Sequence, residues 1–283
     1  MITLIQLSDC HLLKDKDKAA YAGIAPYHSL ARVLSDVQKY VGNSADIKNQ
    51  KLHDAAGGIE QEAKQNKHQK IIVLVTGDIS GDNSAESYQL FASLMHQCIE
   101  RANIEWFVLA GNHDNNPYFE KYVGNRHLKS SKPISLSNWQ IHGLDTRATD
   151  DKYTAAGEVK ENELKAIKQS LEKSAQIHHL IALHHHILPS NSWMDKHFLS
   201  NAQRVVTLTE EHPQIKALIH GHVHSPLRQK IGANNTPSYG SPSTCWQWEM
   251  QSEFGVSNEA SGYQVVNLMD DGSVDVVVNR VEL

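Results

Sequence analysis

The hydrophobic pattern of the chain contains five short apolar runs, and each run ends at a small polar block. The runs are rich in Ile, Val, Leu and aromatic residues, which is typical of strands covered on both faces. They span residues 2–7, 71–76, 106–110, 179–183 and 216–220. The blocks are Asp9-Cys10-His11, Gly77-Asp78, Gly111-Asn112-His113-Asp114, His184-His185-His186 and Gly221-His222-Val223-His224. Ligands of α/β proteins collect at the carboxyl ends of strands, so the blocks are predicted to meet.

Helical periodicity occurs between these strands. Four apolar residues between positions 30 and 37 share one helix face, which we expect to pack on the sheet. A second helix is predicted over residues 84–102, with Ser84 as its N-cap. Further helices are expected over residues 158–175 and over residues 201–211, the latter capped by Asn201. The order of strands and helices predicts an α/β fold.

Two regions depart from this pattern. Residues 41–70 are polar and interrupted by glycines, which indicates an exposed and partly helical insertion. Residues 262–268 and 273–281 alternate around Asp270-Asp271-Gly272, which predicts a β-hairpin and, with it, a second, antiparallel-rich sheet. An additional strand is expected over residues 139–146. No linker composition divides the chain, so a single domain over residues 1–283 with two packed sheets is expected.

Composition limits the range of partners. The chain of 283 residues has a net charge of −5 and 40% hydrophobic residues, so it has no overall basic field that would attract nucleic acid or an anionic membrane. No run of eighteen apolar residues occurs, and Met1 leads directly into a predicted strand, so a cytoplasmic protein is expected. Cys10, Cys98 and Cys245 are too few and too widely spaced for a disulfide framework, and we expect reduced thiols.

The spacing within the blocks predicts metal ligands. Asp9 and His11 are two residues apart, so extended backbone would place them on one face, where one metal could bind both. The same reasoning applies to His222 and His224. Asp78 has two carboxylate oxygens and is expected to bridge two cations, and two metals about 3.5–4 Å apart suit phosphoester displacement.

Two further blocks complete the predicted ligand shell. Asn112 offers a neutral carbonyl oxygen and His184 a neutral imidazole. The resulting shell of oxygen and nitrogen lacks thiolate, which argues against a structural zinc site and favours two divalent ions of manganese or iron, with zinc or cobalt as alternatives. Two roles are left open for His185 and His186: they could support the ligands from behind or pack within the loop.

A proton donor for the leaving group is predicted beside the ligands. His113 follows Asn112 and is not assigned to a metal, so it is the expected general acid. A carboxylate should orient its ring and keep it protonated, and the candidates are Asp82 and Asp114. The alternative for Asp114 is a turn-capping role.

The five blocks resemble those of the calcineurin-like metallophosphoesterase superfamily. That resemblance implies a four-layer α/β/β/α sandwich of the metallo-dependent phosphatase type. It also implies one metal bound by Asp9, His11, Asp78 and His224, a second bound by Asp78, Asn112, His184 and His222, and the acid role for His113. Many members carry the orienting acid three residues after the bridging Asp, where this chain has Gly81.

A closer resemblance is to the bacterial class III 3′,5′-cyclic AMP phosphodiesterases. It involves Tyr21-Ala-Gly-Ile24, residues 192–202, and Pro242-Ser-Thr-Cys245 with Gln247. It implies hydrolysis of 3′,5′-cyclic AMP to 5′-AMP by in-line attack of a metal-bridging hydroxide. A broader phosphodiesterase or phosphomonoesterase acting on linear nucleotides, glycerophosphodiesters or nucleotide sugars is the alternative. A non-catalytic scaffold is a third hypothesis, but every ligand position is filled.

Substrate contacts follow from the same segments. The expected partner is a small-molecule nucleotide, bound by a monomer or a homodimer. The residues expected to contact it are Asn112, His113, His197, Asn201 and His224. Two roles are left open for the aromatic side chains near the blocks: they could stack on a nucleobase or pack in a minor core. They are Trp193, Trp246, Trp248 and Tyr239.

Overall fold

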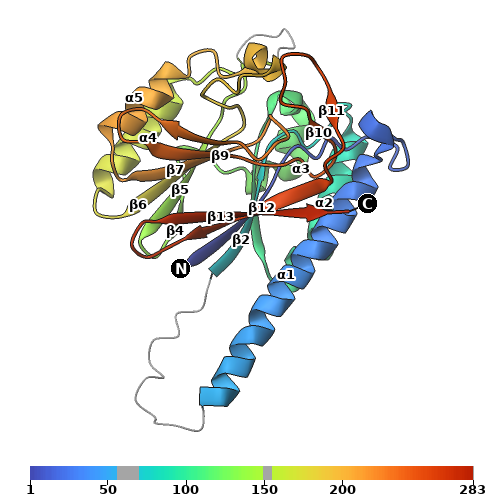
Figure 1. The fold of residues 1–283 in the computed structure, drawn as a ribbon, viewed down its shortest axis with the longest axis horizontal. Coiled ribbons are helices and arrows are strands. Elements are labelled where there is room, and N and C mark those ends of the chain that lie inside the picture. Colours follow the sequence, from blue (N-terminus) through green and yellow to red (C-terminus); the bar gives the residue numbers. More distant parts are fainter. Residues whose placement is uncertain (56–69, 149–154, 283) are drawn as a thin grey trace.

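Two β-sheets lie face to face between two layers of helices in the computed structural model (Figure 1), which describes residues 1–55, 70–148 and 155–282. The first sheet has the strand order β13-β12-β1-β2-β3 and the second has the order β4-β5-β6-β7-β9-β8. This arrangement confirms the predicted α/β class and the four-layer sandwich. Among the described helices, none is both long and apolar enough to cross a membrane.

The strands of the first sheet are β1 (Ile2–Leu7), β2 (Lys70–Thr76), β3 (Glu105–Leu109), β12 (Ser261–Leu268) and β13 (Val274–Val281). Those of the second sheet are β4 (Ile134–Leu136), β5 (Trp139–Leu144), β6 (His178–Leu183), β7 (Ile215–His220), β8 (Arg228–Ile231) and β9 (Thr236–Gly240). A short pair is formed by β10 (Gln247–Trp248) and β11 (Val256–Ser257). The five predicted strands are therefore confirmed, with ends that differ by at most one residue.

Three hydrophobic cores separate the four layers. Along β1, Ile5 and Leu7 pack toward the helices, whereas Ile2 and Leu4 pack into the core between the two sheets. The same alternation occurs on β6, where Ile181 faces the outer helices of the second sheet. Both faces of these strands are buried, which explains why they read as continuous apolar runs.

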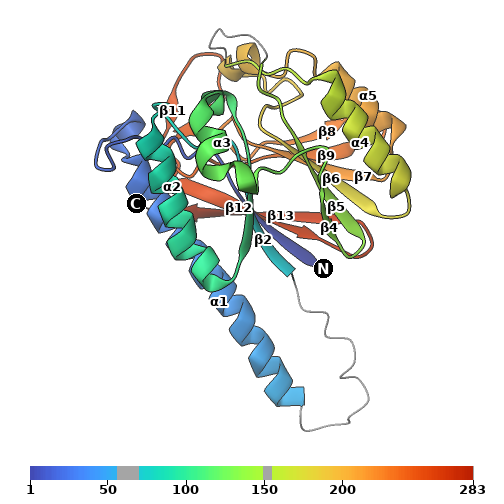
Figure 2. The ribbon, with the colours of Figure 1, turned by 180° about the vertical axis from the view of Figure 1, so that it is seen from behind.

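The helices cover the outer faces of the two sheets. They are α1 (Pro26–Ala55), α2 (Ala85–Cys98), α3 (Pro117–Val123), α4 (Glu161–Lys173) and α5 (Gln203–Glu211). The core over the first sheet includes residues of α1, α2 and α3, and the core over the second includes residues of α4 and α5. Figure 2 shows α1 extending beyond the edge of the sheets toward residue 55. The predicted insertion at 41–70 is helical up to Ala55, and its residues 56–69 lie outside the described part of the chain.

Two sequence predictions are wrong in detail. The C-terminal hairpin forms, but β12 pairs antiparallel with β1, so the hairpin extends the first sheet instead of building a second one. Pairing with β12 covers an edge of β1 that would otherwise be open. Ser84 caps α2 by accepting a hydrogen bond from the Ser87 amide, as predicted, but the N-cap of α5 is Ala202 and not Asn201.

Candidate metal centre

The carboxyl ends of the strands bring the predicted ligands together. Asp9 and His11 follow β1, Asp78 follows β2, His184 follows β6, and His222 and His224 follow β7. Among the described residues, atoms of the kind that bind metals lie within 4.8 Å of one another in four overlapping groups: Asp9 with His11 and His224, Asp9 with Asp78 and His184, His11 with Asp78 and His113, and His184 with His185 and His222. Asn112, in the turn after β3, joins them because its Oδ1 lies 3.1 Å from His184 Nε2. All seven side chains are buried.

The backbone at these positions is left-handed, and not extended as the spacing argument assumed. The φ angles are +54° at Asp9, +46° at His11, +54° at Asp78, +69° at His222 and +44° at His224. A non-glycine residue in this region costs on the order of 1–3 kcal/mol, so the surrounding contacts must hold each turn in place. Strain of this kind concentrates at functional sites.

Glycines allow the strand ends to approach this closely. A Cβ atom on Gly111 would lie 2.2 Å from the Asp78 Oδ1 atom, and one on Gly221 would lie 2.0 Å from the Ser8 hydroxyl oxygen. Neither contact is sterically allowed. The two glycines therefore let the turn after β3 pack against the Asp78 carboxylate and the turn after β7 pack against the end of β1.

Backbone carbonyls fix the orientation of three histidines. His184 donates through Nδ1 to Thr76 O at 2.7 Å, and His224 donates through Nδ1 to the Trp246 carbonyl at 2.9 Å. His222 donates through Nε2 to the His197 carbonyl at 3.0 Å. Because a carbonyl only accepts, the opposite nitrogen of each ring is left with a lone pair that could bind a metal. These carbonyls carry no signal in the sequence, since any residue supplies one.

The two carboxylates are held by amides and faced by imidazoles. Asp9 accepts a hydrogen bond from the His222 amide at 3.0 Å, and Asp78 Oδ1 accepts one from the His113 amide at 2.9 Å. Asp78 Oδ2 lies 3.4 Å from His184 Nε2 and 3.7 Å from His11 Nε2. One oxygen of Asp78 is therefore anchored, while the other faces His11 from the first sheet and His184 from the second.

The electrostatics favour ionised carboxylates here. Burial alone would raise the pKa of Asp78, but His184 and His113 outweigh it and hold that pKa well below its usual range. Burial would lower the pKa of His184, yet Asp78 raises it to about 9. Burial lowers the pKa of His11 to about 3. The site thus contains buried negative charge that a proton on His184 or a cation would balance.

The donor set fits hard or intermediate divalent cations. It offers carboxylate and amide oxygens and imidazole nitrogens. The two nearby thiols are not suited as ligands: burial raises the pKa of Cys10 to about 12 and raises that of Cys245, whose thiol donates to the Asp9 carbonyl at 3.2 Å. All three cysteines are free, as expected.

The predicted acid and its candidate carboxylates lie around the turn after β3. His113 is half-buried, and its ring stands edge-on to His11 with centroids 4.9 Å apart. Asp114 is fully buried and accepts hydrogen bonds from the Tyr88 hydroxyl at 2.6 Å and from the Gly111 amide at 2.9 Å. Burial, with Asp78 nearby, raises the pKa of Asp114. The geometry matches the turn-capping alternative for Asp114.

Asp82 has a different set of contacts. Its carboxylate accepts hydrogen bonds from the Lys14 amide at 2.7 Å and from the Ser84 hydroxyl at 2.6 Å. These bonds join the loop after β1 to the start of α2. Asp82 therefore organises the entry to α2 and the loop after β1.

The remaining histidines of the triple block occupy positions behind the ligands. His185 donates through Nε2 to the Ala155 carbonyl at 3.2 Å and accepts through Nδ1 from the Thr146 hydroxyl at 2.7 Å, so neither nitrogen is left for a metal. His186 is buried beside His222, with ring centroids 5.8 Å apart, and its Nε2 lies 3.7 Å from Asp195 Oδ1.

The predicted substrate contacts divide into two groups. Asn112, His113 and His224 lie in the centre itself. His197 reaches the centre through its backbone carbonyl, which orients His222. Asn201 exchanges two hydrogen bonds of 2.9 Å with the backbone of Val159, so its side-chain amide ties two loops together.

Aromatic rings cover one side of the centre. Trp246 stacks on His11 with centroids 5.2 Å apart, and Trp248 stacks on His224 at 4.7 Å. Trp193 packs edge-on against Trp248 at 5.5 Å. Tyr239, in contrast, lies on β9 against the core between the sheets and 5.6 Å from the Arg228 guanidinium.

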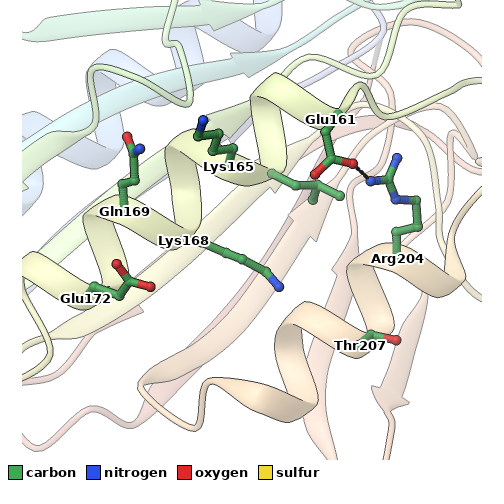
Figure 3. A pocket seen from close by; sticks show the side chains of 8 residues that line it. Glu161, Lys165, Lys168, Gln169, Glu172, Arg204 and Thr207 are labelled. Carbon is green, nitrogen blue, oxygen red and sulfur yellow. Dashed lines mark hydrogen bonds and ion pairs between the residues drawn. The ribbon is translucent and has the colours of Figure 1, made fainter.

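A separate cavity of about 510 Å³ lies between α4 and α5, on the outer side of the second sheet. Figure 3 shows charged side chains around it, including Lys165 and Glu172, and an ion pair between Glu161 and Arg204. Lys168 forms a second ion pair with Glu211 at 3.0 Å. None of the predicted site residues lines this cavity, whose charges are of both signs.

Comparison with known proteins identifies the class. A model of the calcineurin-like phosphoesterase family matches residues 2–226. The chain belongs to this family, and it is a metal-dependent phosphoester hydrolase.

Curated relatives and a solved structure agree with this assignment. The chain is 27% identical over 285 residues to the 3′,5′-cyclic adenosine monophosphate phosphodiesterase CpdA of Haemophilus influenzae, covering 100% of this chain and 91% of that protein. It is 32% identical over 212 residues to a 3′,5′-cyclic-nucleotide phosphodiesterase of Nostoc sp., covering 74% of this chain and 76% of that one. A dimetal phosphatase from Danio rerio shares the fold, with a TM-score of 0.65 at 12% identity and 99% coverage of both chains.

Proposed function

We propose that this enzyme is a cytoplasmic phosphodiesterase that hydrolyses 3′,5′-cyclic AMP to 5′-AMP. The observation that carries the proposal is the convergence of seven ligand-type side chains, Asp78 among them, with His113 beside them. Similarity over the whole chain to curated cyclic AMP phosphodiesterases supports the choice of substrate. The partner is then a small nucleotide, and the assembly a monomer or a homodimer.

Two overlapping sets of side chains would hold the two metals. Asp9, His11, Asp78 and His224 would bind one ion, and Asp78, Asn112, His184 and His222 the other. When bound, the ions would lower the pKa of a water molecule that attacks phosphorus and would neutralise charge on the phosphoryl oxygens. The mixed oxygen and nitrogen donors favour manganese or iron, and zinc or cobalt are compatible with them.

His113 would supply the proton that the leaving group needs. Cleavage of the bond between phosphorus and the ribose 3′ oxygen releases an alkoxide, which is a poor leaving group unless it is protonated. The His113 amide is bonded to Asp78 Oδ1, so the backbone that carries the ring is held against this carboxylate. Its half-buried position leaves it open to a substrate.

Asp114 is the better supported of the two candidate carboxylates. Its hydrogen bonds to Gly111, Ile79 and Tyr88 hold the turn that carries Asn112 and His113 against the end of β2. We infer that Asp114 acts on His113 by positioning this turn. Asp82 would act on the loop after β1.

The remaining substrate contacts follow from position. Asn112, His113 and His224 would contact the phosphate, since they lie in the centre. His197 would act through the carbonyl that orients His222, and its ring would contact the ribose. Asn201 would hold the loop that carries this segment in place.

A substrate panel tests the proposal. Metal-reconstituted protein is assayed with cyclic AMP, cyclic GMP, a glycerophosphodiester, a nucleoside monophosphate and a nucleotide sugar. We expect cyclic AMP to have the highest kcat/KM and 5′-AMP to be the product, with the activity abolished in the Asn112→Ala variant as a control for contaminants. Turnover of another ester without turnover of either cyclic nucleotide would show a broader phosphoesterase and reject the proposal.

A further inference from the structure

Five aromatic side chains form a continuous cluster that begins on the metal ligands and ends at the surface. We call Tyr21, Trp193, Trp246, Trp248 and Phe254 the aromatic cluster. At its inner end, the rings of Trp246 and Trp248 stack on His11 and His224, with interplanar angles of 22° and 25°. The cluster is therefore continuous with the catalytic centre.

The outer end of the cluster is exposed to solvent. Tyr21 is 49% exposed and Phe254 is 54% exposed, and their ring centroids are 6.0 Å apart. Tyr21 lies 5.1 Å from Trp246 and 5.2 Å from Trp248. Among the described residues, no other aromatic side chain is exposed to this degree. Exposed apolar rings that gather at one place mark a binding site more often than scattered ones do.

Hydrogen bonds hold the rings in place before any ligand binds. The Trp193 amide donates to the Gln251 carbonyl at 2.7 Å, and its indole nitrogen donates to the Glu249 carbonyl at 3.1 Å. The short helical turn of Tyr21 is closed by a bond from the Ala20 amide to the Ile24 carbonyl at 2.8 Å. A preformed aromatic surface loses little conformational freedom when a ligand binds.

Trp246 also carries a hydrogen-bond donor that is buried and unpaired among the described residues. The side chain is only 5% exposed, and its indole nitrogen has no hydrogen-bond partner among the described residues. A buried indole N–H normally donates to an acceptor. A ligand with a ring nitrogen or a sugar oxygen beside Trp246 would supply one.

We propose that the aromatic cluster is the nucleobase site of the enzyme and that it takes the purine ring of the substrate, with Tyr21 and Phe254 as the stacking surface and Trp246 as a donor. This proposal rests on the phosphodiesterase function proposed above. Flat rings next to a phosphate-binding metal centre suit a nucleotide, because stacking of a base on an aromatic side chain does not need a charged partner. A glycerophosphodiester or a sugar phosphate has no planar aromatic ring to stack.

The test compares two ligands that differ only in the base. Calorimetry measures the binding of 5′-AMP and of ribose 5-phosphate to the metal-loaded protein. We expect the wild type to bind 5′-AMP at least about fivefold more tightly, which corresponds to the low end of the range for one stacked base. The double variant Tyr21→Leu/Phe254→Leu should lose this preference and bind ribose 5-phosphate within about twofold of the wild type.

Two further variants sharpen the result. Trp246→Phe keeps a ring on His11 but removes the N–H group, so it should weaken 5′-AMP binding severalfold. Tyr122→Leu, on α3, is the matched control and should keep the full preference. A wild type that binds both ligands equally, a double variant that keeps the preference, or a double variant that loses both ligands equally would overturn the proposal.

The outcome is separable from that of the substrate panel. If 5′-AMP is preferred and the double variant loses the preference while cyclic AMP is not hydrolysed, the base site stands and the proposed reaction fails. If cyclic AMP is hydrolysed and the double variant keeps the preference, the reaction stands and the base site fails.

Discussion

At the scale of single residues, the proposed proton donation by His113 should matter for phosphoesters whose leaving group needs a proton and not for the others. A p-nitrophenolate leaves without a proton, whereas a ribose alkoxide needs one. We therefore expect His113→Ala to lower kcat on cyclic AMP by about 10²–10⁴-fold, the usual contribution of general acid catalysis, and to lower it far less on a p-nitrophenyl phosphodiester. The measurement is kcat for both substrates in both proteins.

A matched variant isolates the proton from the shape of the ring. His113→Gln removes the titrating group and keeps a polar side chain of similar reach, while the amide bonded to Asp78 is unchanged. Equal losses on both esters would contradict the acid role and indicate that the ring only positions substrate or metal.

Asn112 provides a second test at this scale. Its Oδ1 lies 3.1 Å from His184 Nε2, within one of the two ligand sets. In the proposed ligand sets, Asn112→Ala removes one oxygen ligand from one metal and none from the other. We therefore expect the variant to lose one of its two metals on dialysis and, with it, most of its activity. Metal analysis of the purified protein measures the ratio, and two metals per chain in the variant would contradict the assignment.

The residues of the centre were predicted because five apolar runs of one chain each end at ligand-type side chains, whereas a single such block would be a weak signal. Their backbone geometry was not, since nothing in the local sequence distinguishes left-handed turns at Asp9 or Asp78 from extended backbone. The carbonyls of Thr76 and Trp246, which orient two ligands, could not be found either, because every residue has a carbonyl. Such partners are fixed only by tertiary structure.

At the scale of the elements, each predicted metal takes ligands from both sheets, so the position of one sheet relative to the other decides whether the ligands meet. Gln6 of β1 joins the two sheets directly. Its amide nitrogen donates to Thr76 Oγ1 at 2.9 Å and to the His220 carbonyl of β7 at 3.1 Å, and its oxygen accepts from Gln264 at 2.7 Å. The side chains of Gln6, Thr76 and Gln264 are buried.

We expect Gln6→Leu to weaken metal binding. The change leaves the buried Gln264 amide without this partner, at about 1–3 kcal/mol, and removes one of two hydrogen bonds to the His220 carbonyl, which keeps its bond from the Ser241 amide. Calorimetric titration with Mn²⁺ measures the affinity, and urea denaturation measures the free energy of unfolding. Thr3→Val is the control, since its hydroxyl bonds to Asn267 of β12 in the same sheet. If both variants bind Mn²⁺ like the wild type, Gln6 contributes to stability alone.

The pairing of elements was the part of the fold that the sequence pattern predicted least well. Burial on both faces identified β1, β2, β6 and β7, but the same pattern is compatible with several strand orders. The C-terminal hairpin was predicted from alternation and its turn, yet its attachment to β1 depends on which sheet edge is free. That choice is made by packing of the whole molecule.

At the scale of the whole molecule, a pair of histidines outside the candidate metal centre links stability to pH. His142 of β5 and His179 of β6 lie in parallel with ring centroids 5.2 Å apart. His179 donates through Nε2 to the Ser174 carbonyl at 3.0 Å, so its Nδ1 accepts from His142 Nε2 at 2.9 Å. A proton on His179 Nδ1 would remove the acceptor that His142 needs, and a proton on the buried His142 Nδ1 would have no acceptor among the described residues, so both rings are neutral in the folded protein.

Stability should fall in acid because of this pair. Burial lowers the pKa of His142 to about 3 and also lowers that of His179. In the unfolded chain a histidine has a pKa of about 6.5, so below that pH the unfolded state binds a proton that the folded state excludes. The stabilisation is complete above about pH 6.5 and is lost as the pH falls toward 3, by up to about 1.4 kcal/mol per pH unit for each proton.

His142→Gln tests this linkage, because glutamine keeps a donor for His179 and does not titrate. Urea denaturation of both proteins between pH 7.5 and 4.5, in the presence of a chelator, measures how the free energy of unfolding changes with pH. Below pH 6.5, we expect the free energy of unfolding to change less steeply with pH in the variant, by the equivalent of about one proton. This difference in slope does not depend on the stability of the variant at pH 7.5. Ligand histidines titrate in both proteins and cancel in the comparison, so identical slopes would mean that His142 is protonated equally in the folded and unfolded states.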